Sequence, residues 1–504
     1  MQQMNRNCKK EKPYFYEVML AAIAIATALL LTLNVNLFGD DFITIEQIRN
    51  YDYLKLIHNL RYDAHPPVFY TLLKGWSYLA GTTIVGLKSF NAFCYIALIA
   101  ASYWGGRLMY GRKFALIATY TFALFPCMLN NPLLFIRMYM VAALFVMLSA
   151  TFAYLLYIKP CSRNKCLFLI FSLLACFTHY YATFFTGIIH LILYISLIRK
   201  DKKQWKQCAV YALTILALFL FWLPTFLKQL ALKQETIVDQ TSLVNRIVKS
   251  IVFPFHTGSH LPVKDYLSYA TTIVLLLATI VLIGITIWFV SKGKCKLTKV
   301  ERNASLISIG LPITIMTGLV LVGSFTKPIW FGNYITLFFP VMALGLGFLV
   351  WKLDDKRITV CWFVLLSICF IQKLYLQAKM CQDTAYENYL ALYEAGTISS
   401  DDTIIEANQR TSAYFIDVPQ YKAGIDRPKD WYSFQYDHIK IVPNYESILK
   451  DKNSFFSTVE LTDSIYPTKA NGFKLVKEWH FKSQYYDFID VELYQYKRNG
   501  TGCR

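Results

Sequence analysis

The chain has 504 residues, of which 56% are hydrophobic and 16% are charged, and its net charge is +19. A soluble globular domain is nearer to about 45–50% apolar and about 25% charged. The composition therefore excludes a disordered chain, a coiled coil and a small disulfide-bonded secreted domain, and it predicts a membrane protein with several spans.

The positive charge is unevenly distributed along the chain. Residues 1–376 carry a net charge of +22, whereas residues 377–504 carry −3. The basic excess thus lies between apolar runs, as the positive-inside rule places it. No basic soluble module is present, so we do not expect nucleic acid as a partner.

Ten apolar runs are long enough to be candidates for membrane spans. They cover residues 16–37, 86–108, 114–130, 133–157, 166–198, 208–227, 267–290, 305–326, 332–351 and 358–376. The run 166–198 is too long for one span, and the polar sequence at 178–181 interrupts it. We expect two short helices there that meet at one membrane face, which gives about eleven transmembrane helices in total.

Basic clusters in alternate loops predict the orientation. Such clusters occur at 112–113, 199–206 and 292–302, and the positive-inside rule assigns these loops to the cytoplasm together with the N-terminus. The first apolar run lacks a small-residue cleavage site, so we expect a retained anchor rather than a cleaved signal. The loops 38–85 and 228–266 then lie on the outer face, as does the chain after residue 376.

Residues 377–504 have a different character from the membrane domain predicted for residues 1–376. Alternating apolar and polar residues at 403–405, 438–442 and 488–493 predict strands. We therefore expect a small extracytoplasmic α/β domain at the C-terminal end. Of the twelve cysteines, only Cys381 and Cys503 fall in this domain, and no cysteine spacing is typical of a zinc site.

The first outer loop contains the strongest candidate for chemistry. Asp40 and Asp41 follow the first span, and Asp63 and His65 come just before two prolines. One carboxylate could act as a general base while its neighbour positions it and raises its pKa. The alternative is an acidic pair that caps a helix beginning at residue 42. The two prolines present His65 rigidly, which favours a role in positioning a substrate.

These residues resemble the first-loop signature of the GT-C glycosyltransferases. The similarity is to the branch that contains the protein O-mannosyltransferases and the lipid A aminoarabinose transferase, which shows an Asp-Glu pair followed by His-Pro-Pro-Leu-Tyr-Tyr. Here the sequence has Asp40-Asp41 and then His65-Pro66-Pro67-Val68-Phe69-Tyr70, with further matches at 137–139 and 178–182. The resemblance covers about residues 10–350 and implies the GT-C fold.

Two positions depart from the pattern of that family. Asp41 stands where the family usually has Glu, and Asn333-Tyr334 stands where an Arg-Tyr pair often opens the tenth span. The second departure removes a cation that would contact the carrier phosphate. Lys327, in the same outer loop, could substitute for it.

The resemblance implies a transferase that takes a sugar from a polyprenyl-phosphate carrier, usually with inversion, with Asp40 as the general base. A lipid, a glycan or a protein could be the acceptor, and the bacterial inner membrane is the expected location. The residues expected to bind substrate or carrier phosphate are Asp63, His65, Arg137, Tyr139, His179, Tyr180, Lys327, Asn333 and Tyr334. Arg137 could instead snorkel to the interface, and His179 and Tyr180 could be interfacial anchors.

A second hypothesis is a transporter or flippase for a lipid-linked sugar, or a polysaccharide-assembly protein without this chemistry. Transporters usually show charges or broken helices near the bilayer midplane, and internal repeats. Here the carboxylates cluster near the outer surface, which favours the enzyme. His256 and His260 are four residues apart, but Gly258 argues against a helix that would align them. We predict no cofactor, and the sequence leaves open whether the protein uses a divalent metal.

Overall fold

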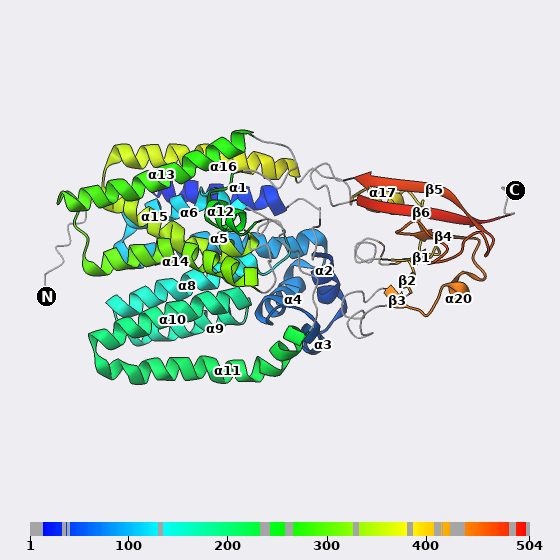
Figure 1. The fold of residues 1–504 in the computed structure, drawn as a ribbon, viewed down its shortest axis with the longest axis horizontal. Helices are drawn as coiled ribbons and strands as arrows, with labels where there is room; N and C mark the ends of the chain where they lie inside the picture. Colours follow the sequence, from blue (N-terminus) through cyan, green and yellow to red (C-terminus); the bar gives the residue numbers. More distant parts are fainter. Residues whose placement is uncertain are drawn as a thin grey trace.

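The molecule consists of a bundle of long helices with a small sheet beyond one end of it (Figure 1). We call this end of the bundle the sheet end and the other the opposite end. The computed structural model describes residues 14–32, 37, 41–129, 135–231, 242–257, 266–325, 332–380, 387–407, 415, 417–423, 439–482 and 490–499.

Helices occur at all eleven positions where spans are predicted. They are α1 (Phe15–Thr32), α5 (Ile84–Tyr110), α6 (Arg112–Ala123), α8 (Tyr139–Ile158), α9 (Ser162–Cys176), α10 (Tyr180–Lys200), α11 (Trp205–Ala231), α13 (Tyr266–Ser291), α14 (Lys299–Phe325), α15 (Phe339–Leu353) and α16 (Lys356–Met380). Within the described part of the chain, seven are long and apolar enough to cross a membrane, namely α5, α8, α10, α11, α13, α14 and α16. The chain is therefore a polytopic helical membrane protein, while the number of eleven spans stays a prediction.

The predicted break in the long apolar run is confirmed. Helix α9 ends at Cys176 and α10 begins at Tyr180, with His179 as its N-cap in an extended conformation. The His179 Nδ1 atom accepts a hydrogen bond from the Tyr181 backbone N–H at 3.1 Å. A side chain that caps the helix in this way satisfies one of the donors that its first turn leaves open.

At two of the predicted spans the α-helix begins several residues later than the apolar run. Helix α8 begins at Tyr139, six residues after the start of the predicted run, so Arg137 lies just before the helix. The run predicted from residue 332 begins with a 3-10 segment, η5 (Gly332–Leu337), and α15 starts only at Phe339. In both places apolar residues continue the hydrophobic run through a segment that is not an α-helix.

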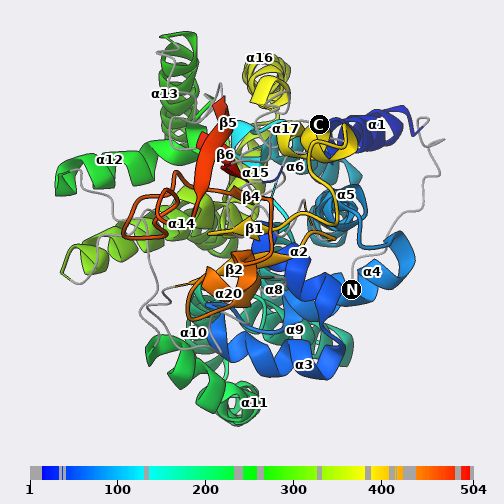
Figure 2. The ribbon, with the colours of Figure 1, turned by 90° about the vertical axis from the view of Figure 1, so that its right-hand side faces the viewer.

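Short helices gather at the sheet end (Figure 2). These are α2 (Asp41–Asn50), α3 (Tyr53–Asn59) and α4 (Val68–Ala80), and α2 and α3 both pack against α4. Helix α4 begins directly after the two prolines and ends at Gly81, whose φ of +78° a residue with a side chain would rarely adopt. The other short elements are η1 (Leu60–Tyr62), η2 (Pro126–Leu129), η3 (Lys202–Gln204), α12 (Leu243–Val252) and η4 (Phe253–Phe255).

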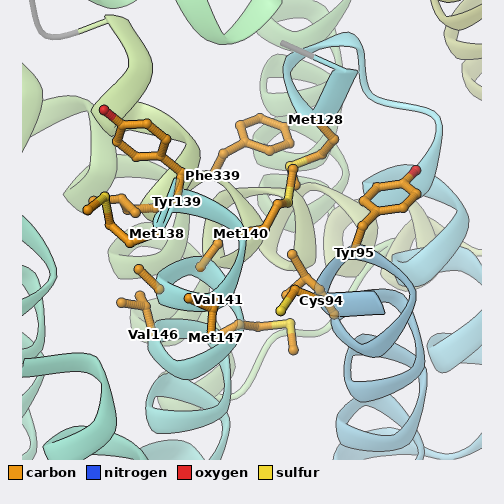
Figure 3. Close-up of a cluster of buried hydrophobic side chains, with 14 of the residues drawn as sticks. Cys94, Tyr95, Met128, Met138, Tyr139, Met140, Val141, Val146, Met147 and Phe339 are labelled. Carbon is orange, nitrogen blue, oxygen red and sulfur yellow. The ribbon is translucent and has the colours of Figure 1, made fainter. Parts of the chain in front are cut away.

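Buried apolar side chains from several helices meet inside the bundle (Figure 3). Cys94 and Tyr95 of α5, Met128 of η2, Met147 of α8 and Phe339 of α15 belong to this core. Methionine side chains are flexible, so Met128 and Met147 can fill irregular gaps between the helices. The core thereby joins the helices that carry the sheet-end residues described below.

Two glycines allow α6 to approach its neighbours closely. A Cβ atom on Gly347 of α15 would lie 2.5 Å from the Ala118 Cα of α6, and one on Gly106 of α5 would lie 2.8 Å from the Ala115 Cα. Small residues at such contacts are typical of helix packing in membranes, because dispersion forces between close backbones replace the hydrophobic effect.

Ion pairs fix helices together at the opposite end. Arg112 donates to both carboxylate oxygens of Glu17, at 2.6 and 2.8 Å, and Tyr103 donates to the same carboxylate. Lys352 of α15 pairs with Glu301 of α14 at 2.7 Å. These contacts hold α1 against α5 and α6, and α14 against α15.

The C-terminal sheet has six strands in the order β3-β2-β1-β4-β6-β5. The strands are β1 (Ile404–Ile405), β2 (Gln420–Lys422), β3 (Ile439–Ile441), β4 (Ser454–Ser457), β5 (Phe473–Lys482) and β6 (Asp490–Arg498), accompanied by α17 (Glu387–Glu394) and α20 (Glu446–Leu449). The pairs among β3, β2, β1 and β4 are parallel, and those of β6 with β4 and β5 are antiparallel. The predicted strands coincide with β1, β3 and β6, which confirms the α/β character of this domain.

Candidate functional site

Three predicted residues from distant parts of the chain meet at the sheet end. His65 precedes α4, Arg137 precedes α8, and His179 caps α10. The Arg137 Nη2 atom lies 2.8 Å from the His65 Nε2 atom, and the rings of His65 and His179 are 5.2 Å apart between centroids. We call these three residues the histidine–arginine cluster.

The Arg137 side chain points into the protein. It is only 6% exposed, and its Nη1 atom donates to the Thr44 hydroxyl of α2 at 3.3 Å and to the Tyr70 hydroxyl of α4 at 3.4 Å. A snorkelling arginine would instead extend its guanidinium towards water. These contacts orient the guanidinium towards the two histidines.

The hydrogen bonds determine where each histidine carries its proton. Arginine can only donate, so the His65 Nε2 atom accepts from Arg137 and the His65 proton is on Nδ1. The His179 Nδ1 atom accepts from the Tyr181 backbone, so the His179 proton is on Nε2. Both of these N–H groups are buried, and neither has a hydrogen-bond partner among the residues that the structure describes.

Burial keeps both histidines neutral. It lowers the pKa of the His65 imidazole well below its usual value, and the positive charge of Arg137 adds to this effect. Burial likewise lowers the pKa of His179, with smaller contributions from His65 and Arg137. A neutral imidazole donates one hydrogen bond, so the cluster offers two N–H donors beside a guanidinium.

Aromatic rings line one side of the cluster. The Tyr334 ring of η5 lies 4.4 Å from the Tyr181 ring and 5.4 Å from the His179 ring, between centroids. Tyr139, the first residue of α8, lies 5.8 Å from His179 and 6.1 Å from Tyr334. Tyr139 and Tyr334 were both predicted for the site, and the structure places them beside each other.

Two of the predicted carboxylates are buried near the cluster. The Asp41 Oδ1 atom accepts a hydrogen bond from the Ile136 backbone N–H at 2.8 Å, which joins the start of α2 to the residue before Arg137. The Asp63 Oδ1 atom accepts from the Ala64 N–H at 2.6 Å. Helix α2 begins at Asp41 itself, so Asp41 is the first residue of the helix rather than its N-cap.

A chain of hydrogen bonds holds the loop that carries His65. The Trp222 Nε1 atom donates to the Tyr180 hydroxyl at 3.0 Å, and that hydroxyl donates to the Gln229 side chain. The Gln229 Nε2 atom in turn donates to the backbone carbonyls of Leu60, at 2.6 Å, and His65, at 3.2 Å. Tyr180 therefore acts on the site through this chain rather than in the cluster itself.

Thr44, Trp222 and Gln229 escaped the sequence reasoning, and Tyr70 entered it only as the last residue of the first-loop motif. Thr44 and Tyr70 orient Arg137, and Trp222 and Gln229 fix the His65 loop. For Gln229 the only available signal is a polar residue at the end of a long apolar helix. Thr44 looks like an ordinary residue of a short helix.

Some predicted positions fall outside the described residues. Asp40, Lys327 and His260 are among these, as is the side chain of Asn333. Within the part of the chain that the structure does describe, no group of three or more His, Cys, Asp or Glu residues could hold a metal ion.

Among the solved structures to which the chain is similar are two of one protein. No family model and no curated protein matches the sequence. A crystal structure of ArnT from Cupriavidus metallidurans in the apo state is 12% identical and has a TM-score of 0.48, covering 95% of this chain and 98% of that one. A crystal structure of the same protein bound to undecaprenyl phosphate is 11% identical, with a TM-score of 0.49 and coverage of 96% and 98%. These values are too low to establish a family or an activity.

Proposed function

We propose that the chain is a membrane glycosyltransferase of the GT-C type. It takes a sugar from a polyprenyl-phosphate carrier and transfers it to an acceptor hydroxyl on the outer face of the membrane. The observation that carries this proposal is the histidine–arginine cluster, which joins three predicted motifs beside the start of α2. In this proposal residues 1–376 form the catalytic membrane domain and residues 377–504 the extracytoplasmic domain.

The cluster suits the phosphate of the carrier. The guanidinium of Arg137 and the N–H groups of His65 and His179 are hydrogen-bond donors, and a phosphate offers only acceptors. Negative charge builds up on the phosphate oxygens as the sugar departs. Donors already held in place stabilise that charge without reorganising during the reaction.

Asp40 is proposed as the general base. It immediately precedes Asp41, whose bond to the Ile136 backbone anchors the start of α2 next to Arg137. The acceptor oxygen forms a bond to the anomeric carbon, and its proton passes to Asp40. The bond from the anomeric carbon to the phosphate oxygen breaks, and the carrier phosphate leaves with the electron pair. Attack opposite the leaving group inverts the anomeric configuration.

The aromatic residues beside the cluster provide apolar surface for the rest of the donor. Tyr139 and Tyr334 lie next to His179, where a sugar ring or the first prenyl unit could pack against them. A lipid, a glycan or a protein could present the acceptor hydroxyl. In this proposal the chain lies in a bacterial inner membrane, with its N-terminus in the cytoplasm.

The position of the cluster along the helices disfavours the flippase alternative. Tyr139 is the first residue of α8, and His179 caps α10, so the cluster lies at helix ends. Transporter sites for substrates usually lie near the bilayer midplane, between broken helices. A site at the helix ends reaches an acceptor in water more readily than it moves a headgroup across the bilayer.

The test compares purified wild type with Asp40→Asn on a panel of radiolabelled polyprenyl-phosphate sugars, with candidate acceptors added. Loss of a general base typically costs about 10²–10⁴-fold in rate, so release of free carrier phosphate should fall by at least about 100-fold while donor binding is retained. Asp451→Asn, at an exposed position near the sheet, is the matched control and should not change the rate.

Two results would contradict this proposal. Full carrier release by Asp40→Asn would remove Asp40 from the mechanism. Donor binding without release by the wild type, together with movement of the donor across the bilayer of liposomes, would establish the flippase instead.

A further inference from the structure

A cavity lies at the opposite end of the bundle. Its volume is about 490 Å³, within the range of roughly 300–1,000 Å³ that is usual for ligand sites. Helices α8, α10, α14 and α15 line most of it. Arg199 at its mouth lies 20 residues along α10 from His179, or about 30 Å, whereas Phe185 at its inner end lies six residues, or about 9 Å, from His179. The mouth of the cavity is therefore distant from the proposed active site.

The inner part of the cavity is apolar. Phe185, Ile189 and Leu193 lie four residues apart along one face of α10, and Leu311 and Phe348 face the cavity from α14 and α15. A site with these walls takes a hydrocarbon chain more readily than a sugar or a nucleotide, because each polar group would lose its hydrogen bonds to water there.

The mouth of the cavity is positively charged. Arg199 and Lys200 at the end of α10 and Lys299 at the start of α14 line it, and all three are exposed. Glu301 is the only carboxylate among the described lining residues, and Lys352 neutralises it at 2.7 Å.

The neighbouring Asp201 brings one negative charge against these three cations at the mouth. Its Oδ1 atom accepts from the Lys203 N–H at 3.0 Å, so its carboxylate caps its own turn. Lys200 reaches the Tyr157 carbonyl at 3.4 Å, which holds its side chain beside the cavity. The described part of the mouth thus keeps a positive charge.

We propose that this cavity binds an anionic phospholipid of the bilayer. Arg199, Lys200 and Lys299 hold the phosphate headgroup, and one acyl chain occupies the apolar interior. The 14 residues from Phe185 to Arg199 span about 21 Å, whereas one leaflet is about half of a hydrocarbon core roughly 30 Å thick. The cavity is thus long enough for the chain of a lipid in a single leaflet. This proposal does not depend on the transferase activity.

Lipid binding to the purified, detergent-solubilised protein tests the proposal. Intact-protein mass spectrometry would compare phosphatidylglycerol with phosphatidylcholine of the same acyl chains. The variant Arg199→Gln/Lys299→Gln should bind phosphatidylglycerol at least about tenfold more weakly than the wild type, since each basic residue attracts anionic lipid. The matched control is Lys292→Gln/Lys296→Gln, which removes two exposed cations that do not line the cavity. It should change the affinity less than about twofold.

A second variant tests the cavity without changing the charge. Ser196 lines the mouth, and Ser196→Phe should weaken binding of phosphatidylglycerol by filling the space for the acyl chain. Equal binding of both lipids by the wild type would overturn the proposal, and so would equal losses in the two double variants. Displacement of phosphatidylglycerol by polyprenyl phosphate at a lower concentration would also overturn it, because the cavity would then be a carrier site.

Discussion

At the scale of single residues, the two histidines of the cluster, each with a buried ring nitrogen, are the most informative feature. The hydrogen bonds of Arg137 and of the Tyr181 backbone place one proton on each imidazole, at His65 Nδ1 and at His179 Nε2. Both rings are held neutral beside a cation, so protonation of either would add a second positive charge to a buried site. The free energy of unfolding should therefore decrease as the pH falls and protonation of these histidines becomes more favourable.

The prediction is that the wild type loses stability as the pH falls below about 6.5. The unfolded chain binds protons at an ordinary histidine pKa, whereas the folded pKa values of His65 and His179 are lowered. Below pH 6.5 the unfolded state therefore binds more protons, and the free energy of unfolding decreases with falling pH. The loss is at most about 1.4 kcal/mol per histidine for each pH unit.

Melting temperatures in detergent between pH 5.5 and 8 would measure this effect. The variant His65→Gln/His179→Asn removes both titrating groups while keeping polar side chains, and Asn is a good N-cap for α10. Its melting temperature should fall less between pH 7 and 5.5 than that of the wild type. His58→Gln, at an exposed position of α3, should keep the wild-type dependence. The same slope in all three proteins would contradict the prediction.

The sequence singled out His65, Arg137 and His179, which the structure brings together, but it did not show how they are held. The two prolines mark His65 as rigidly presented, and a cation next to an apolar run marks Arg137. Their contact joins positions 72 residues apart, and the contact of Gln229 with the His65 carbonyl joins positions 164 apart. Such pairings arise from the packing of helices, and no local pattern encodes them.

At the scale of elements, hydrophobic runs located the helices because a bilayer requires long apolar segments whose backbone groups are internally hydrogen-bonded. The polar residues at 178–181 revealed the break between α9 and α10. The same criterion started the helices α8 and α15 too early, since hydrophobicity does not distinguish a helix from the apolar segments of another conformation at 135–138 and 332–338.

The close contact between α15 and α6 leads to a prediction about a substitution at Gly347. A Cβ atom on Gly347 would overlap the Ala118 Cα atom at 2.5 Å, so Gly347→Ala must push α15 away from α6. Overpacking of this kind typically costs about 1–3 kcal/mol, and we expect a lower melting temperature in detergent.

The control is Gly284→Ala in α13, where no atom lies within 4 Å of the added Cβ. There the change should be neutral or stabilising, because Ala favours a helix over Gly by about 0.5–1 kcal/mol. Equal effects of the two substitutions would contradict this account of the contact.

At the scale of the whole molecule, the chain separates its two candidate sites along the bundle. The histidine–arginine cluster lies at the sheet end, and the cavity with the basic mouth lies at the opposite end. The basic turns between helices gather at the opposite end, as the positive-inside rule requires of a cytoplasmic face. Both proposals therefore depend on one orientation: the cluster must face the acceptor outside, and the basic mouth must face the inner leaflet.

Labelling of cysteines in intact cells tests that orientation. Cys161 is exposed and caps α9 at the opposite end, whereas Asp451 is exposed near the sheet. A membrane-impermeant maleimide should modify the cysteine of Asp451→Cys in intact cells and should modify Cys161 only after the membrane is permeabilised, with each site identified by peptide mass spectrometry. Cys161→Ser provides the control for assignment of the peptide.

Labelling of Cys161 in intact cells would show that the orientation is the reverse of the one proposed, since a charged reagent cannot cross the hydrocarbon core. The cluster would then face the cytoplasm, where an outer-face transfer could not occur.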